Sequence, residues 1–309
     1  DIYLWNRCLM IKPARSQILL VVVIGIIGVS LAAIWVRLAV DTVMVHNQVG
    51  FSLFLAASRM ILATIILLPT WKNLKLDRAK STAYYYAIAA GLCLAIHFAT
   101  WITSLAYTSI AASTVLVTTN PIWVGLFSWW WYREKLSLQG IIGIGIALFG
   151  GVIMAIADSN IDGSYSNPIL GDLLALIGAV MSSLYMIFGS QAQRRGLDTG
   201  SYVAIAYFTA ALCLFPLPFL FKVSYLGYQG KVYLYVCLMA LMSQIIGHTS
   251  LNWSMRWISP TVISLSLLFE PVIASFVGAI VFGEVPSINL LLGGLIILGG
   301  IGVFIKQSA

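Results

Sequence analysis

Long apolar stretches recur along this chain from end to end. A helix needs about 20 apolar residues to cross the roughly 30 Å hydrocarbon core of a bilayer. The predicted spans cover residues 16–39, 50–69, 82–106, 111–132, 138–157, 169–193, 201–221, 232–256, 260–283 and 287–305. The sequence therefore predicts an all-α, polytopic membrane protein with ten transmembrane helices.

The composition and the distribution of charge agree with a place in a lipid bilayer. Hydrophobic residues make up 61% of the 309 residues and charged residues only 9%, whereas a soluble domain carries about 25% charged residues. The net charge is +7, but the basic residues gather in alternate loops, as the positive-inside rule describes. We interpret this charge as a sign of topology and not of a nucleic-acid partner. Both termini are then cytoplasmic, and a plasma (inner) membrane is the expected location.

An internal repeat divides the chain into two halves. Sliding the sequence by 150 residues pairs Pro121 with Pro271, Glu134 with Glu284, Ser137 with Ser287, Gly143 with Gly293, Gly150 with Gly300, and Gly28 with Gly178. Each half holds five spans, and an odd number makes the second half enter the membrane from the opposite side. We therefore predict two inverted five-helix repeats, residues 1–157 and 158–309. Transporters built in this way hold their substrate near the membrane midplane, between the halves.

Glu270 lies midway along the span 260–283 and is followed directly by Pro271. An acid in hydrocarbon is costly, about 2.5–3.5 kcal/mol on insertion scales, so it usually faces the bundle interior and has a function. The proline removes the hydrogen bond to the Leu267 carbonyl. We expect an exposed carbonyl, an acid and a kink at one depth, which indicates a binding site. Glu270 would bind a cationic group or a proton there, or else be a structural partner for an arginine.

Two stretches carry a resemblance to a known family. They are Pro121…Glu134-Lys135-Leu136-Ser137 and Glu270-Pro271-Val272-Ile273-Ala274…Phe282-Gly283-Glu284. They resemble the paired signature of the EamA type of the drug/metabolite transporter superfamily, and the likeness covers nearly the whole chain. The resemblance implies a ten-helix bundle with a central cavity lined by spans 1–4 and 6–9, while spans 5 and 10 pack outside. Members of the superfamily move amino acids, other metabolites and drugs, so the resemblance does not identify the substrate.

Two arginines within the predicted spans are candidates for binding an anionic substrate group. Arg59 lies in the middle of the span 50–69, where a charge needs a partner or water. It would form an ion pair between helices, with Glu270 as one option, or hold a substrate carboxylate with its planar guanidinium. Arg37 lies near the external end of the first span. It would extend to the lipid headgroups or contact an anion at the entrance.

A polar stripe runs along the span 232–256. Gln244, His248 and Asn252 recur every four residues, so on an α-helix they share one face. We expect this face to line a cavity, the alternative being hydrogen bonds between helices. His248 is also a candidate proton site, because histidine titrates near neutral pH.

The span 82–106 carries Cys93, His97 and Trp101 at the same spacing. His97 and Trp101 are candidates for lining the site, as is Tyr185, whose ring is either a cavity wall or a packing residue. Cys93 and His97 have a metal-like spacing, but two ligands without nearby acids do not predict a metal site. No CxxC pair occurs, so neither a disulfide framework nor a zinc site is indicated. Neither a metal nor a cofactor is expected.

Asn120 precedes Pro121 in the first half, as Glu270 precedes Pro271 in the second. Both prolines are predicted helix kinks. Asn120 would cap a carbonyl freed by the proline or line the pocket.

These features predict a secondary transporter that exports or exchanges a small polar or zwitterionic metabolite, such as an amino acid, by alternating access. Arg59 or Arg37 would hold a carboxylate while Glu270 faces an amino group or a proton, so proton coupling is an option. The expected partners are this small-molecule substrate and the lipid bilayer. Glycines spaced seven residues apart in spans 5 and 10 favour close helix packing, either between the two halves or in a homodimer.

Three alternatives stay open, and one of them is a passive channel. A drug-type exporter would alternate Glu270 between a proton and a lipophilic cation, and an intramembrane enzyme would use His97 and His248. No phosphate-binding loop, zinc signature or nucleophile elbow occurs in the sequence, and the loops are too short for a catalytic or ATPase domain. We therefore predict that the protein is not an enzyme. The driving force for transport would come from solute or ion gradients across the membrane.

Overall fold

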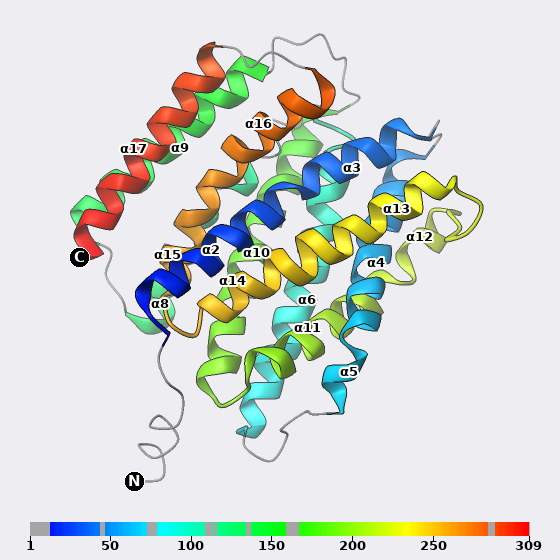
Figure 1. Cartoon of the computed structure of the whole chain (residues 1–309), viewed down its shortest axis with the longest axis horizontal. Helices are drawn as coiled ribbons and strands as arrows, with labels where there is room; N and C mark the ends of the chain where they lie inside the picture. The colour runs from blue at the N-terminus through cyan, green and yellow to red at the C-terminus, as the bar shows by residue number, and fades with distance from the viewer. Residues whose placement is uncertain are drawn as a thin grey trace.

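The computed structural model describes residues 13–43, 47–72, 79–108, 113, 116–133, 137–158, 167–283 and 288–308. Within these ranges the chain is a bundle of helices without a β-strand (Figure 1). The helices are α2 (Arg15–Ser30), α3 (Ala32–Asp41), α4 (Gln48–Ile66), α5 (Leu68–Trp71), α6 (Ser81–Ser104), α8 (Asn120–Tyr132), α9 (Leu138–Asp158), α10 (Pro168–Arg194), α11 (Thr199–Leu214), α12 (Leu217–Leu220), α13 (Gly230–Leu238), the π-helix η2 (Met239–His248), α14 (Thr249–Ser254), α15 (Pro260–Ser266), the 3₁₀ turn η3 (Leu267–Phe269), α16 (Glu270–Phe282) and α17 (Ile288–Ser308).

The described residues of each predicted span are mostly helical. Seven helical runs of the described chain are long and apolar enough to cross a membrane: Arg15–Asp41, Gln48–Ile66, Ser81–Ser104, Pro168–Arg194, Thr199–Leu220, Gly230–Ser254 and Pro260–Phe282. The remaining predicted spans coincide with α8, α9 and α17. The predicted all-α membrane fold is therefore confirmed. Glu134 and Glu284, paired by the repeat, lie outside the described residues, and the domain boundary at residues 157 and 158 stays a prediction.

Polar side chains in the loops set where several helices begin. Asn47, Asn167, Asp198 and Ser259 each accept a hydrogen bond from the backbone N–H three residues later, at 2.9, 3.2, 2.9 and 3.4 Å. Such a cap satisfies one of the N–H groups that a helix start leaves without an intrahelical partner. These four helices thus begin at polar residues that precede the apolar runs in the sequence.

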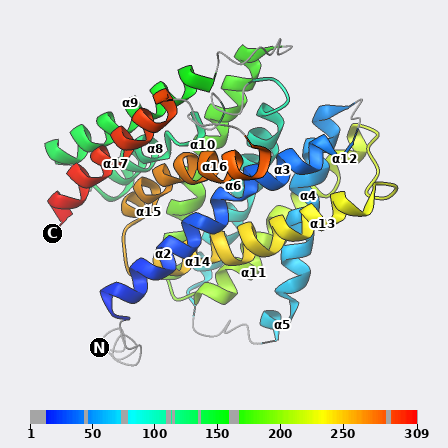
Figure 2. The same cartoon turned by 45° about the horizontal axis from the view of Figure 1, so that its top comes forward.

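The fifth helices of the two halves, α9 and α17, pack side by side at one edge of the bundle (Figures 1 and 2). A Cβ atom added to Gly150 would lie 2.6 Å from the Gly293 carbonyl oxygen, and one added to Gly300 would lie 2.6 Å from that of Gly143. Gly150 thus meets the earlier glycine of α17 and Gly143 the later one, so the two helices are antiparallel. A shift of 150 residues relates Gly143 to Gly293 and Gly150 to Gly300, and therefore converts one contact into the other. Such reciprocity is what a two-fold relation produces. Equivalent helices therefore run in opposite directions, as predicted for inverted repeats.

The same relation holds in the centre of the bundle. A Cβ atom on Gly28 of α2 would lie 2.8 Å from Cα of Gly247 in η2. The 150-residue shift takes this pair to Gly178 and His97, and the Gly178 carbonyl accepts a hydrogen bond from His97 Nδ1 at 2.9 Å. Two pairs of helices, α2 with η2 and α6 with α10, thus approach closely at related points.

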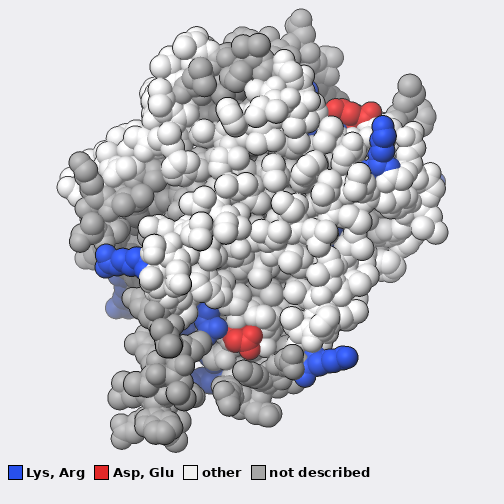
Figure 3. All heavy atoms as spheres, in the orientation of Figure 1, with Lys and Arg blue, Asp and Glu red and all other residues white. Residues whose placement is uncertain are grey.

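The outer surface of the bundle suits lipid. Figure 3 shows one face on which charged side chains lie toward the lower and upper margins, with an uncharged area between them. Large apolar side chains are exposed on helices around the bundle, among them Leu20, Leu212 and Ile280. An apolar surface of this extent would be unusual for a soluble monomer, whereas hydrocarbon requires it.

Candidate functional site: a central cavity between the halves

A small cavity lies in the middle of the bundle, between helices of both halves. Its volume is about 40 Å³, which holds roughly three water molecules. Five pairs of lining residues are separated by 150 positions in the sequence: Ala32 and Ser182, Phe98 and His248, Trp101 and Leu251, Val117 and Leu267, and Asn120 and Glu270. The cavity therefore lies where the two repeats meet, which is the place expected for a substrate site in an inverted-repeat transporter.

Asn120 occupies the first-half position next to a helix-breaking proline. With its side-chain amide nitrogen facing the neighbouring carbonyls, Asn120 donates hydrogen bonds to the backbone carbonyls of Val117 and Ala179, each at 2.9 Å. The Val117 carbonyl is the one that Pro121 deprives of its helical partner. Asn120 thus contacts the freed carbonyl and also lines the cavity.

Glu270 occupies the related position in the second half, and its environment differs. Pro271 was expected to leave the Leu267 carbonyl exposed, but this prediction is wrong, because the backbone N–H of Glu270 donates to that carbonyl in the 3₁₀ turn η3. The tighter turn satisfies the carbonyl without a side chain. The Glu270 carboxyl group lines the cavity, and within the described chain no hydrogen bond engages it. It is therefore available to a ligand or a proton.

Arg59 brings a positive charge into the same cavity from the middle of α4. Its side chain is only 1% exposed. Nη2 donates to Oε1 of Gln244 at 2.8 Å, and the guanidinium carbon lies 4.1 Å from the centre of the Phe98 ring. Glu270 interacts with Arg59 through space, but among the described residues no salt bridge joins them. Nε and Nη1 of Arg59 have no hydrogen-bond partner in the described part of the protein.

Both buried histidines line the cavity, linked by an aromatic ring. The His97 ring is parallel to that of Trp101, with 5.9 Å between centroids. Phe98 lies between the histidines, 4.9 Å from the His97 ring and 5.6 Å from the His248 ring. Nδ1 of His97 is engaged by the Gly178 carbonyl, which leaves Nε2 for the cavity. The predicted positions of His97, Trp101 and His248 are thus brought together.

The predicted single face of Gln244, His248 and Asn252 is not a single face in the structure. His248 and Asn252 line the cavity, whereas Gln244 does not and instead contacts Arg59. The physical reason is the π-helix η2, in which hydrogen bonds run from residue i to i+5 and the helix is wider than an α-helix. Gln244 therefore aligns with Thr249, whose Oγ1 donates to the Gln244 carbonyl at 3.3 Å.

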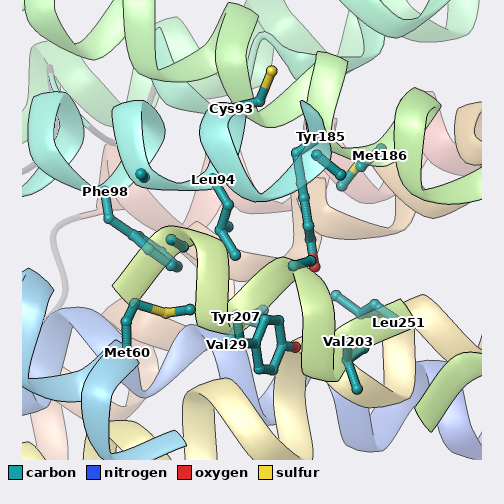
Figure 4. Packing of buried hydrophobic residues seen from close by; sticks show 14 of the residues in the cluster. Val29, Met60, Cys93, Leu94, Phe98, Tyr185, Met186, Val203, Tyr207 and Leu251 are labelled. Carbon is teal, nitrogen blue, oxygen red and sulfur yellow. The ribbon is translucent and has the colours of Figure 1, made fainter. Parts of the chain in front are cut away.

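Tyr185 is fixed by a buried network. Asn252 Nδ2 donates to the Tyr185 hydroxyl at 2.6 Å and lies 3.4 Å from that of Tyr207, while the backbone carbonyl of Asn252 accepts from Gln193 Nε2 at 2.8 Å. Figure 4 shows Phe98, Tyr185 and Tyr207 within one packed apolar core. Tyr185 and Asn252 thus form a hydrogen-bonded part of the cavity wall.

Comparison with known proteins identifies the family. A model of the EamA-like transporter family matches residues 15–156 and again residues 169–306. This chain belongs to the EamA-like transporter family. The resemblance to the drug/metabolite transporter superfamily is thereby confirmed, and the chain is a multi-pass membrane protein. The family and the names of its relatives point to a membrane transporter rather than to an enzyme.

Relatives of this EamA-like protein occur in bacteria and yeast. The uncharacterized transporter YoaV of Bacillus subtilis is 26% identical over 294 residues, which cover 91% of this chain and 95% of YoaV. YdfC of the same organism is 24% identical over 198 residues, and the match covers 62% of this chain and 61% of YdfC. The uncharacterized vacuolar membrane protein YML018C of Saccharomyces cerevisiae is 25% identical over 251 residues, and the match covers 72% of this chain and 61% of YML018C.

The fold of the EamA-like protein matches a solved structure. One crystal structure superposes with a TM-score of 0.74, covering 96% of this chain and 98% of that one at 19% sequence identity. This likeness concerns the fold alone.

Arg37 is the candidate that the fold places apart from the others. Its guanidinium carbon lies 4.1 Å from the centre of the Phe282 ring, near the end of α16, and it does not line the cavity. Sequence reasoning also missed Phe98 and Ser182. The repeat held a signal for Phe98, since its partner in the 150-residue shift is the predicted residue His248.

Proposed function

We propose that this EamA-like protein is a secondary transporter that exports or exchanges a small polar or zwitterionic metabolite, such as an amino acid, by alternating access. The observation that carries the proposal is the presence of opposite charges, Arg59 and Glu270, in one buried cavity between the halves. A zwitterion such as an amino acid carries a carboxylate that could pair with Arg59 and an ammonium group that could pair with Glu270. Arg59 would bind the carboxylate, because two of its nitrogens have no partner in the described chain, and Glu270 would face the ammonium.

The size of the cavity is consistent with a transport cycle of several states. Pockets that hold a small-molecule ligand measure about 300–1,000 Å³, and this cavity measures about 40 Å³. A metabolite would therefore bind after the two repeats have moved apart on one side or the other. In alternating access such movement takes place around a fixed site, and a substrate drives it only if it binds the two states differently.

Glu270 also gives the proposal a route to proton coupling. The carboxyl group binds either a proton or the ammonium group of a substrate, and in the described chain it has no competing hydrogen bond. A proton would then leave as substrate enters, which links transport to a pH gradient. The orientation with both termini in the cytoplasm, the plasma membrane as location and a homodimer remain parts of this proposal.

One observation favours a second candidate, a lipophilic cation. The rings of Phe98, Trp101 and Tyr185 line the cavity, and aromatic faces attract organic cations. The charge of Arg59 opposes this reading, because it would repel a cation that has no carboxylate of its own.

Ligand-dependent thermal stability of the purified protein tests the proposal. The panel contains amino acids, organic acids without an amino group, amines and the lipophilic cation tetraphenylphosphonium. A ligand selective for the folded state stabilises by about 2.7 kcal/mol at 100 times its Kd. We expect stabilisation by one or more amino acids, which Arg59→Gln and Glu270→Gln each abolish. Stabilisation by tetraphenylphosphonium alone, lost only in Glu270→Gln, would contradict the proposal and support the second candidate.

A further inference from the structure

Arg59 and its hydrogen-bonded neighbour Gln244 carry three hydrogen-bond donors without partners. They are Nε and Nη1 of Arg59 and Nε2 of Gln244, and in the described part of the chain none donates to a protein acceptor. Arg59 is 1% exposed and Gln244 is 0% exposed. Buried donors are normally paired, so a group of unpaired ones indicates a ligand that supplies acceptors. The arrangement fits an anion.

Gln244 is held in place from several sides. Its Oε1 accepts from Arg59 Nη2 at 2.8 Å. Its backbone carbonyl accepts from the hydroxyl of Tyr207 at 3.4 Å and from that of Thr249 at 3.3 Å. The π-helix turns Gln244 away from the cavity-lining residues His248 and Asn252 and toward Arg59. Gln244 therefore acts on a ligand mainly through Arg59.

The charge balance of the site depends on this residue. Among the described acids, Glu270 alone lines the cavity, whereas Asp41, Asp158, Asp172 and Asp198 lie at or near helix ends. Gln244 meets Arg59 with a neutral amide, which orients the guanidinium without neutralising it. A glutamate would be nearly the same in shape, but it would pair with Arg59 and use up its charge.

We propose that Gln244 is a specificity-determining positioning residue, which keeps the charge of Arg59 available and so selects a substrate with a carboxylate. This inference rests on the proposed function and names the anionic group that the site requires. One guanidinium next to a nearby carboxyl group suits a monoanion. A phosphate, with two charges, would meet repulsion from Glu270.

The test compares four amino acids, L-alanine, L-serine, L-leucine and L-phenylalanine, with their amides, which keep the ammonium and lack the carboxylate. Affinities are measured by thermal stabilisation of the purified full-length protein. In the wild type, at least one acid binds more tightly than its amide. Gln244→Glu weakens that acid about 30-fold and leaves the amide as tight or tighter, so the preference reverses. The neutral control Gln244→Asn weakens the acid less and keeps the preference.

Several results would overturn the inference about Gln244. An unchanged preference for the acid in a folded Gln244→Glu variant overturns the inference and leaves the proposed function standing. Equal losses for the acid and the amide, in both variants, would also overturn it, because they would indicate a purely structural role. A wild-type protein that binds none of the eight compounds overturns this inference, and it overturns the proposed function as well if the wider panel of metabolites also gives no ligand. If Gln244→Glu does not fold, the shorter pair Gln244→Asp and Gln244→Asn is compared by the same criteria.

Discussion

Replacing Glu270 with glutamine is expected to lower zwitterion transport at least about 30-fold and to abolish its response to a pH gradient. The amide keeps the shape of the side chain, but it has no charge for an ammonium group and carries no proton across the membrane. Loss of one buried charge partner costs about 2 kcal/mol or more, and about 1.4 kcal/mol corresponds to a factor of ten. Uptake into proteoliposomes, with and without an imposed pH gradient, measures both effects.

Glu270→Asp is the matched control, because it retains a carboxyl group one methylene shorter. Its transport is expected to be slower than that of the wild type and still to respond to the pH gradient. Wild-type rates and an unchanged pH response in Glu270→Gln would mean that Glu270 is neither a substrate contact nor a proton carrier.

The substitution Gly28→Ala is expected to lower the free energy of unfolding by about 1–3 kcal/mol and to impair transport. The added Cβ would lie 2.7 Å from the Met242 carbonyl oxygen and 2.8 Å from Cα of Gly247. Both atoms belong to the backbone of η2, so α2 and η2 must move apart. Because η2 carries Gln244 and His248, the displacement reaches the cavity. Denaturation of the purified protein in detergent gives the change in stability.

Gly178→Ala provides a control at the repeat-related position. There the nearest atoms to an added Cβ are Oγ1 of Thr100 and Cβ of Trp101, each at 3.3 Å. A shift of a few tenths of an ångström relieves such a contact, and alanine gains up to about 1 kcal/mol of helix propensity over glycine. We expect little net change. Equal destabilisation by the two substitutions would contradict the close approach of α2 and η2.

The fold could be predicted from the sequence to a large extent, because a bilayer imposes few solutions. Apolar runs of sufficient length become helices, since backbone groups in hydrocarbon must bond within their own helix. The glycine pairs Gly143 with Gly293 and Gly150 with Gly300 indicated the repeat, and the structure brings these glycines together across α9 and α17.

Local hydrogen bonding explains where the predictions for the site were wrong. The Leu267 carbonyl was expected to be exposed, but a 3₁₀ turn pairs it with the backbone of Glu270. Gln244 was expected on the face of His248, but a π-helix turns it toward Arg59. Pro271 marks where the first departure occurs, but it does not show that a 3₁₀ turn will satisfy the carbonyl. The π-helix has no clear signal in the sequence, and in the structure Tyr207 contacts Gln244 and Thr249 at its C-terminal end.

The sequence predicted that both arginines lie within apolar spans, but it did not predict which way their side chains point. Both Arg59 and Arg37 belong to apolar spans, yet only Arg59 lines the cavity, while Arg37 lies over Phe282. The direction of a side chain depends on how its helix is rotated in the bundle. Hydrophobic periodicity defines that rotation poorly when a helix is apolar on all sides.

Solute counterflow in proteoliposomes tests the central claim most directly. Vesicles that hold wild-type protein or Arg59→Gln are loaded with the amino acid that stabilises the wild type most, and entry of its labelled form is followed over time. We expect transient, saturable accumulation of label by the wild type and its loss in Arg59→Gln. Entry that rises linearly with concentration without counterflow would indicate a channel, and wild-type counterflow by Arg59→Gln would remove Arg59 from the substrate site. Either result would contradict alternating access around Arg59 and Glu270.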